Sequence, residues 1–218
     1  MSAYQQILQQ LGHTKLIGVS KTKSVEDILA LYHEGLKTFG ENKVQEVCEK
    51  YEQLPKDIEW HLIGHLQSNK VKYIAPFVYM IHSVDSLKLL DEIEKQASKC
   101  NRVIKVLLQM HIASEETKFG LNTKELIEIL EYYTANPSVY SHIQIAGVMG
   151  MATNTDHEET IRKEFQHLKS LFQFAKDTYL LGDKNFTEIS MGMSSDYKIA
   201  IEEGSTMVRI GSLLFGKR

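Results

Sequence analysis

The stretch LIGVSKTKSVEDILALYHEGLKTFGEN at residues 16–42 decides the fold. It begins with a short apolar run at 16–20, which is typical of a buried strand. Apolar residues at helical spacing follow at 24–36, and a second short apolar run comes at 38–42. The stretch therefore predicts a strand, a helix and a second strand, with Lys21 directly after the first strand.

The same alternation continues along the rest of the chain. Eight short apolar runs are present, at 16–20, 38–42, 59–64, 78–84, 102–112, 143–151, 187–192 and 206–216. A helical pattern follows each of the first seven runs. Strands that are apolar throughout and alternate with amphipathic helices indicate a parallel sheet covered by helices.

Eight strand–helix units in 218 residues match the size of a (β/α)8 barrel. We therefore predict the α/β class and a single domain, residues 1–218, built as a TIM-type barrel with an extra helix at 2–11. No linker rich in proline, glycine or serine divides the chain. A doubly wound open sheet is the alternative arrangement of the same elements.

The composition excludes several classes of protein. A hydrophobic content of 43% supplies one sizeable core, and a charged fraction of 24% is typical of folded globular chains. The net charge of -3 gives no general attraction to nucleic acid or anionic membranes, and no apolar stretch is long enough to span a bilayer. Cys48 and Cys100 are far apart and indicate no disulfide framework. Without a signal peptide, we expect a cytoplasmic protein.

Lys21 is the first candidate for chemistry, because ligands of such barrels bind at the carboxyl ends of the strands. Shielding from water there favours the neutral amine, which attacks a carbonyl to form a Schiff base. The charge of Lys23, two residues on, would favour the neutral amine further. A surface lysine in a loop is the ordinary alternative, and position alone does not exclude it.

Small residues after the last two apolar runs indicate an anion site. The segment MGMSSD at 191–196 leads into a helix that Ser194 or Ser195 is expected to cap, and Gly211 and Ser212 follow the last run. Small side chains and free backbone N–H groups suit a phosphate. Ordinary loops and helix caps have the same composition.

Three polar residues lie in or beside apolar runs. Arg209 lies inside the last run, where a charge needs either a carboxylate partner or a ligand. His61 and His65 share a face of the third run, and we expect the first to be packed and the second to line a pocket. Their spacing resembles a zinc pattern, but that pattern needs a helix and a third ligand, so we predict no metal site.

Seven motifs resemble those of the YggS/PROSC family of pyridoxal phosphate homeostasis proteins, in the same order. They are VSKTK at 19–23, FGENKVQE at 39–46, WHLIGHLQSNK at 60–70, TKFG at 117–120, GVMGM at 147–151, MGMSSD at 191–196 and GSTMVRIGSLLFG at 204–216. The chain departs from the family at Ser24, where members commonly have proline. The resemblance implies an alanine racemase-type barrel that binds pyridoxal 5'-phosphate (PLP).

The resemblance also implies the residues that bind the cofactor. They are Lys21, Asn42, Met193, Ser194, Arg209, Gly211 and Ser212, with Lys118 as a secondary contact. Lys21 would hold PLP as a Schiff base, and Arg209 would face the pyridine nitrogen. Ser194, Gly211 and Ser212 would bind the phosphate, with Asn42 and Met193 near the ring or the phosphate.

A cofactor carrier is the function that the resemblance implies. Because a guanidinium is a permanent donor, Arg209 should leave the ring nitrogen unprotonated and weaken the electron sink that PLP enzymes use. Alanine racemases add a second, β-rich domain with a catalytic tyrosine, and the chain ends at 218 without one. We therefore expect a protein of intracellular PLP homeostasis that buffers or supplies the cofactor, without catalytic residues or strong turnover.

Two enzymatic alternatives stay open. One is a low-activity PLP-dependent amino-acid racemase, which the missing second domain disfavours. The other is an aldolase-type barrel in which Lys21 reacts with a sugar phosphate, which the full set of motifs disfavours. The expected partners are PLP and apo forms of PLP-dependent enzymes. We expect a monomer that binds neither nucleic acid nor a membrane.

Overall fold

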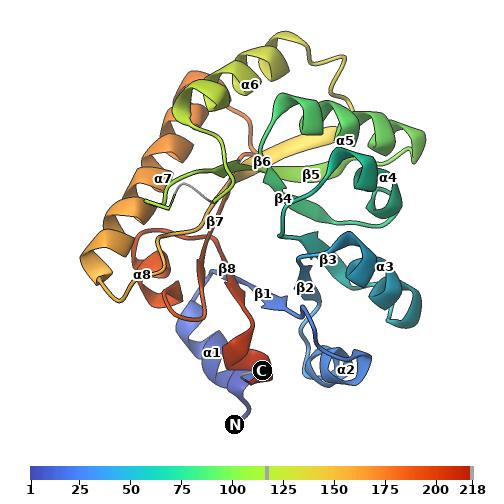
Figure 1. The fold of residues 1–218 in the computed structure, drawn as a ribbon, viewed down its shortest axis with the longest axis vertical. Coiled ribbons are helices and arrows are strands. Elements are labelled where there is room, and N and C mark those ends of the chain that lie inside the picture. Colours follow the sequence, from blue (N-terminus) through green and yellow to red (C-terminus); the bar gives the residue numbers. More distant parts are fainter. Residues whose placement is uncertain (116–117, 217–218) are drawn as a thin grey trace.

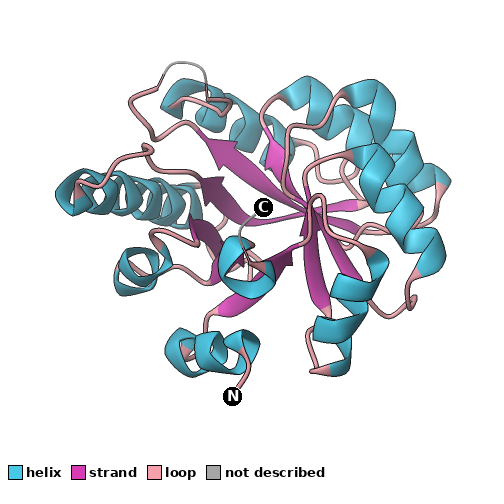
Figure 2. Ribbon diagram, turned by 60° about the horizontal axis from the view of Figure 1, so that its bottom comes forward, coloured by secondary structure: helices cyan, strands magenta, loops and turns pink. Residues whose placement is uncertain are grey.

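Eight parallel strands form a closed barrel in the computed structural model, which describes residues 1–115 and 118–216. The strands are β1 Lys15–Val19, β2 Thr38–Glu41, β3 Glu59–Leu62, β4 Met80–Val84, β5 Ile104–Met110, β6 Ile143–Gly150, β7 Glu188–Met193 and β8 Met207–Ile210. Each strand pairs with the next along the chain, and β8 pairs with β1. Figure 1 and Figure 2 show the strands inside a ring of helices.

Helices connect the strands and cover the outside of the barrel (Figure 2). They are α1 Ala3–Leu11, α2 Val25–His33, α3 Val44–Gln53, the 3-10 turn η1 Ser68–Lys70, α4 Val71–Ile74, α5 Leu87–Lys99, α6 Thr123–Ala135, α7 Glu158–Thr178, α8 Tyr197–Glu202 and α9 Ser212–Phe215. Within the described ranges, none of these helices has the length and hydropathy needed to cross a membrane.

Closure of the sheet confirms the predicted barrel, and the open-sheet alternative is wrong. The register pairs Lys15 with Met207 and Leu16 with Val208, so neither end strand keeps a free edge. Every predicted strand is present, with bounds that differ by a few residues. The short helix α9 was not predicted, because it lies inside the segment taken as the last strand and its exit.

Apolar side chains pack in two separate clusters. The larger one joins the outer faces of the strands to the helices. The smaller one comes from strand residues alone: Met80, Leu107, Ala146, Met149 and Met207. Because side chains alternate between the two faces of a strand, Met207 and Arg209 lie on the same inner face of β8. The interior therefore combines a small apolar cluster with buried polar side chains.

Ser24 begins α2 through a capping box. Its hydroxyl accepts a hydrogen bond from the Asp27 N–H at 3.2 Å, and its own N–H donates to the Asp27 carboxylate at 3.1 Å. This reciprocal pair satisfies donors that a helix start leaves free. Ser24 is thus a helix cap directly after the Lys21 turn.

Candidate functional site

The carboxyl ends of the strands surround a cavity of about 690 Å³. It is lined by Val19, Lys21, Lys23, Asn42, Ile63, Met151, Met193, Ser194, Ser195, Arg209, Gly211, Ser212, Leu213 and Gly216. Its volume lies in the range of pockets for small molecules and cofactors. All seven residues that the sequence assigned to cofactor binding line this one cavity.

Lys21 lies in a tight turn after β1 and not in the strand itself, which ends at Val19. The next residue, Thr22, has a left-handed backbone with φ of 65°. The N–H of Thr22 donates to a carboxylate oxygen of Glu46 at 2.5 Å. The turn is therefore fixed from α3, and it presents the half-buried Lys21 side chain to the cavity.

A buried ion pair between Lys50 and Glu41 holds this turn in place. The Lys50 ammonium lies 2.7 Å from a carboxylate oxygen of Glu41, from one of Glu46 and from the Ser20 carbonyl. The Ser20 hydroxyl donates to the same Glu41 oxygen at 2.6 Å. Burial raises the pKa of Glu41, against the opposing hydrogen bonds from Lys50 and Ser20. The sequence analysis missed this network, although a glutamate inside an apolar run was its signal.

Lys23 also lines the cavity. Its ammonium donates to the Phe215 carbonyl at 3.1 Å and lies 5.9 Å from the centre of the Phe215 ring. Two lysines, one held by α9 and the other in the β1 turn, thus face the same space.

Arg209 is buried, with 4% of its surface exposed, and it also faces the cavity. It donates to the Ser190 carbonyl at 2.8 Å, to the Ser190 hydroxyl at 2.7 Å and to the Gly150 carbonyl at 3.1 Å. A guanidinium has five N–H donors, so donors remain for a ligand. In the described ranges it forms no ion pair with a carboxylate. Burial lowers its pKa to about 10, which leaves it a cation at neutral pH.

A chain of buried side chains lies behind Arg209. The Ser190 hydroxyl is 3.0 Å from His82 Nδ1, and His82 Nε2 is 2.8 Å from His61 Nδ1. Burial, together with the charges of Lys15 and Lys105, lowers the pKa of His61 to about 3. Both rings are therefore neutral near pH 7, since burial also lowers the pKa of His82 far below its usual range.

His65 has a different environment. Its ring stacks on Phe119 with centroids 4.2 Å apart, and its Nδ1 is 3.1 Å from an Asp85 oxygen. It is exposed and, as expected, lines a pocket, but this is a neighbouring pocket that it shares with Asn42 and not the cavity of Lys21. His61 was correctly expected to be packed. Over the residues that the structure describes, no three His, Cys, Asp or Glu side chains are grouped to hold a metal ion.

Because His61 stays neutral in the folded protein, we expect the protein to lose stability in acid. From pH 6.5 down to about pH 3, the unfolded chain binds a proton at His61 that the folded chain does not. Unfolding then takes up that proton, so the free energy of unfolding falls by about 1.4 kcal/mol per pH unit for this residue. In urea titrations at several pH values, His61→Asn should reduce the slope by this amount. An equal slope in the wild type and in His61→Asn would contradict the prediction.

The loops after β7 and β8 meet at one side of the cavity. The Gly211 N–H donates to the Ser194 hydroxyl at 3.3 Å, and a Cβ on Gly211 would lie 3.2 Å from the Val19 carbonyl. Ser212 begins α9, whose first N–H groups have no partner within the helix. Loops after the seventh and eighth strands of such barrels frequently bind phosphate.

The expectation that Ser194 or Ser195 caps α8 is wrong. Asp196 takes the N-cap position, and its carboxylate accepts the Met193 N–H at 2.6 Å in the turn before the helix. An aspartate one residue nearer the helix therefore displaces the serines from that role. Both serines line the cavity instead.

Asn42 and Lys118 differ in their relation to the cavity. Asn42 lines it and is held by close backbone packing, because a Cβ on Gly64 would lie 2.4 Å from the Asn42 carbonyl. Lys118 does not line it, and its ammonium bonds to the Ala152 carbonyl at 2.6 Å and to Glu115 at 3.0 Å. Thr117, from the same motif, lies outside the described residues.

Known proteins of similar fold and sequence show which family the chain belongs to. The sequence model of the family described as "Alanine racemase, N-terminal domain" matches residues 2–218. Alanine racemase from Bartonella henselae superposes with a TM-score of 0.69 at 16% identity, over 99% of this chain and 59% of the racemase, which shows a shared fold. PipY of Synechococcus elongatus PCC7942, solved with PLP bound, superposes with a TM-score of 0.88 at 32% identity over 98% of both chains.

Two curated relatives carry the same name. The pyridoxal phosphate homeostasis protein of Aquifex aeolicus is 44% identical over 205 residues, which cover 94% of this chain and 87% of the relative. That of Homo sapiens is 37% identical over 215 residues, covering 94% and 76%. The fold and the lysine-bearing cavity define an alanine racemase-type barrel protein. Within that class, the chain belongs to the family of pyridoxal phosphate homeostasis proteins.

Proposed function

We propose that this protein binds PLP in the cavity at the carboxyl mouth of the barrel, and that it buffers the cofactor and supplies it to apo-enzymes in the cytoplasm. One observation carries the proposal: a lysine, a buried arginine and the small residues of the last two loops line a single cavity of about 690 Å³. The name of its relatives and the PLP bound to PipY support it.

Lys21 is the attachment point in this proposal. PLP is an aldehyde, and its carbonyl would condense with the Lys21 amine to a Schiff base with loss of one water. The turn held by Glu46 fixes the lysine backbone, so the side chain reaches the cavity from one direction.

The other groups of the cavity suit the remaining parts of the cofactor. Ser194, Gly211 and Ser212 offer small side chains and backbone N–H groups for the phosphate. Asn42 and Met193 lie on the lining where they would contact the ring or the phosphate. Ile63, Met151 and Leu213 lie in the quoted motifs but were assigned no role, and they add apolar surface to the same lining.

Arg209 supports the role of a carrier. Arg209 lines the cavity, and a permanent guanidinium donor at the pyridine nitrogen would keep that nitrogen unprotonated. The cofactor then stabilises carbanions poorly, so turnover of amino acids is expected to be weak. At the rim of the cavity, Met193 and Leu213 are 36% and 43% exposed, which leaves apolar surface near the bound cofactor for a recipient enzyme.

A titration of cofactor-free protein with PLP tests the proposal. We expect a visible absorbance band, and borohydride reduction followed by peptide mapping should place a pyridoxyl group on Lys21. Pyridoxal without phosphate should bind more weakly, because the loops after β7 and β8 then have no ligand. A protein that stays colourless would overturn PLP binding. Racemisation of amino acids at ordinary enzyme rates, about 1–1,000 per second, would overturn the carrier role.

A further inference from the structure

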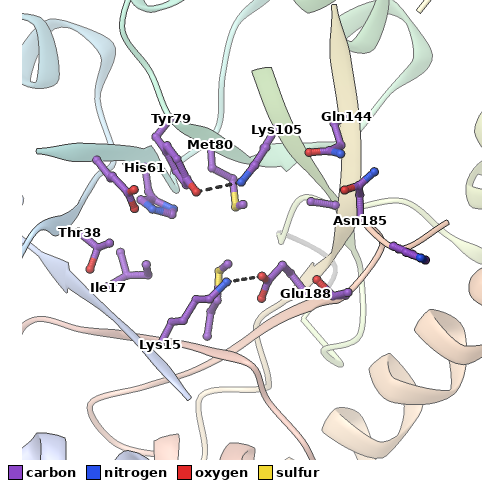
Figure 3. Close-up of a pocket in the computed structure, with 15 residues that line it drawn as sticks. Lys15, Ile17, Thr38, His61, Tyr79, Met80, Lys105, Gln144, Asn185 and Glu188 are labelled. Carbon is purple, nitrogen blue, oxygen red and sulfur yellow. Dashed lines mark hydrogen bonds and ion pairs between the residues drawn. The ribbon is translucent and has the colours of Figure 1, made fainter. Parts of the chain in front are cut away.

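A second cavity, of about 210 Å³, opens at the opposite end of the barrel. Its lining comes from strand beginnings such as Lys15, Thr38 and Glu59, and from the loop before β7 (Figure 3). Neither Lys21 nor Arg209 lines it. Its volume is below the range of about 300–1,000 Å³ for drug-sized ligands, so it suits a small ion or molecule.

Positive charge exceeds negative charge in this second cavity. Lys15, Lys105 and Lys184 line it, against Glu59 and Glu188. Lys15 pairs with Glu188 across the lower side in Figure 3. Lys105 donates to the Tyr79 hydroxyl at 2.9 Å, and in the described part of the chain neither it nor Lys184 has a carboxylate partner. Two ammonium groups are thus free to bind an anion.

His61 supplies a buried polar atom that needs a partner. The residue is 1% exposed and lines the second cavity, where it lies beside Tyr79 (Figure 3). Its Nδ1 contacts His82, so its Nε2 lies on the side of the ring away from His82, and the residue lines the second cavity. Within the described ranges, this Nε2 has no hydrogen-bond partner. A buried polar atom without a partner is costly and marks a place for a ligand or a water.

The direction of the hydrogen bonds between Arg209 and His61 determines whether His61 Nε2 needs a donor or an acceptor. The Ser190 hydroxyl oxygen accepts from Arg209, so its own proton is given to His82 Nδ1. His82 then carries its proton on Nε2 and donates it to His61 Nδ1. A neutral His61 consequently carries its proton on Nε2. This series of hydrogen bonds starts at the Arg209 cation and ends at the His61 Nε2–H donor, which requires an acceptor.

We propose that the amino-terminal mouth of the barrel binds a small oxyanion, held by His61 Nε2–H, Lys105 and Lys184, and that the chain through His82 and Ser190 couples this site to Arg209. Each hydrogen bond of such a chain polarises the next. An oxyanion at His61 therefore strengthens every link up to the guanidinium. Through Arg209 it changes the electrostatic environment of whatever lies in the cavity at the carboxyl mouth.

Histidine NMR on the purified protein tests the site without reference to the cofactor. Long-range ¹⁵N–¹H spectra should show His61 and His82 as Nε2–H tautomers. Inorganic phosphate should shift the His61 Nε2 signal in a saturable way, and acetate, as a second probe, tells whether a planar carboxylate binds as well. A proton on Nδ1 of either ring would contradict the proposed direction of the hydrogen bonds from Arg209 to His61. A His61 signal that no probe moves, with only water bound, would overturn the site.

Substitutions in the second cavity test which side chains bind the phosphate. Lys105→Met removes a cavity charge and keeps the stem, and it should weaken phosphate at least about tenfold, as expected for a lost charge-assisted hydrogen bond. Lys72→Met is the matched control, because this exposed lysine also lies over a tyrosine ring, 5.0 Å from the Tyr73 centroid. His61→Asn keeps an acceptor for His82 and removes the Nε2–H donor, so it should weaken phosphate similarly. Equal phosphate affinity in the wild type and Lys105→Met, as read from the His61 Nε2 signal, would contradict the proposal.

The coupling between the second cavity and Arg209 rests on the proposed binding of PLP, and a separate measurement tests it. In PLP-loaded protein, saturating phosphate should shift the visible band, and Lys105→Met should abolish the shift while Lys72→Met keeps it. A phosphate site without a band shift would refute the coupling alone. A protein that never binds PLP would refute the proposed function, and the histidine NMR would still decide on the oxyanion site.

Discussion

Replacing Lys21 with alanine is expected to remove the visible absorbance band of the PLP-treated protein and all pyridoxyl label after borohydride reduction. The reason is chemical: alanine has no amine to condense with the aldehyde. Contacts to the phosphate and the ring remain, so we expect residual binding that is at least about a hundredfold weaker, a loss of about 2.7 kcal/mol. Absorbance titration and mass spectrometry of the reduced protein measure both effects.

Lys23→Ala is the matched control for this experiment. Lys23 lines the same cavity two residues away, but its ammonium donates to the Phe215 carbonyl. This variant should keep the band and the label on Lys21. If label persisted in Lys21→Ala and disappeared in Lys23→Ala, the attachment point would be Lys23 and the assignment of Lys21 would be wrong.

Replacing Lys50 with methionine is expected to destabilise the protein by about 3–5 kcal/mol, the usual cost of leaving a buried charge without its partner. Glu41 is fully buried, and one of its oxygens already lacks a hydrogen-bond partner among the described residues. Without Lys50, the Ser20 carbonyl and Glu46 also lose a donor. Urea denaturation at pH 7 measures the loss, and PLP affinity should fall because the Lys21 turn loses its support.

A second substitution tells whether the stability lost in Lys50→Met comes from the unpaired charge of Glu41 or from altered packing. Lys50→Met combined with Glu41→Gln removes both charges and should recover most of the lost stability. Burial already raises the pKa of Glu41, and loss of Lys50 raises it further. Protonation of Glu41 then favours the folded state, so the deficit of Lys50→Met should be largest at neutral pH and shrink as the pH falls. Exposed Lys43→Met is the control, and a deficit that did not change with pH would contradict this explanation.

The fold could be predicted from the sequence because each strand is covered on both sides. A strand such as β5 is buried at nearly every position and apolar at five of its seven, and this pattern together with the helices between strands permits few arrangements. The ends of elements were less certain. The last apolar run was taken as one strand, but the backbone turns at Gly211 into α9, and a short helix of four residues has too little periodicity to be recognised.

The site was predicted in part, for a physical reason. Residues that follow apolar runs, such as Lys21 and Ser212, converge because parallel strands end at one mouth. The polar residues inside the barrel were harder to assign. His82 and Ser190 are separated by 108 positions in sequence, and only closure of the barrel places them 3.0 Å apart. The Lys50–Glu41 pair likewise depends on how α3 packs on β2.

The closing contact between β1 and β8 has a consequence for biosynthesis. Thr14 bonds to the Ser205 carbonyl across 191 positions, and Lys15 bonds to the Thr206 carbonyl beside it. A ribosome adds about 5–20 residues per second, so β1 waits on the order of 10–40 seconds for its partner. During that time its edge is open to wrong pairing, which makes the nascent chain a candidate for chaperone protection. The cavity at the carboxyl mouth needs the loops after β7 and β8, so Lys21 leaves the ribosome long before this cavity is complete, and we expect PLP to bind only after translation.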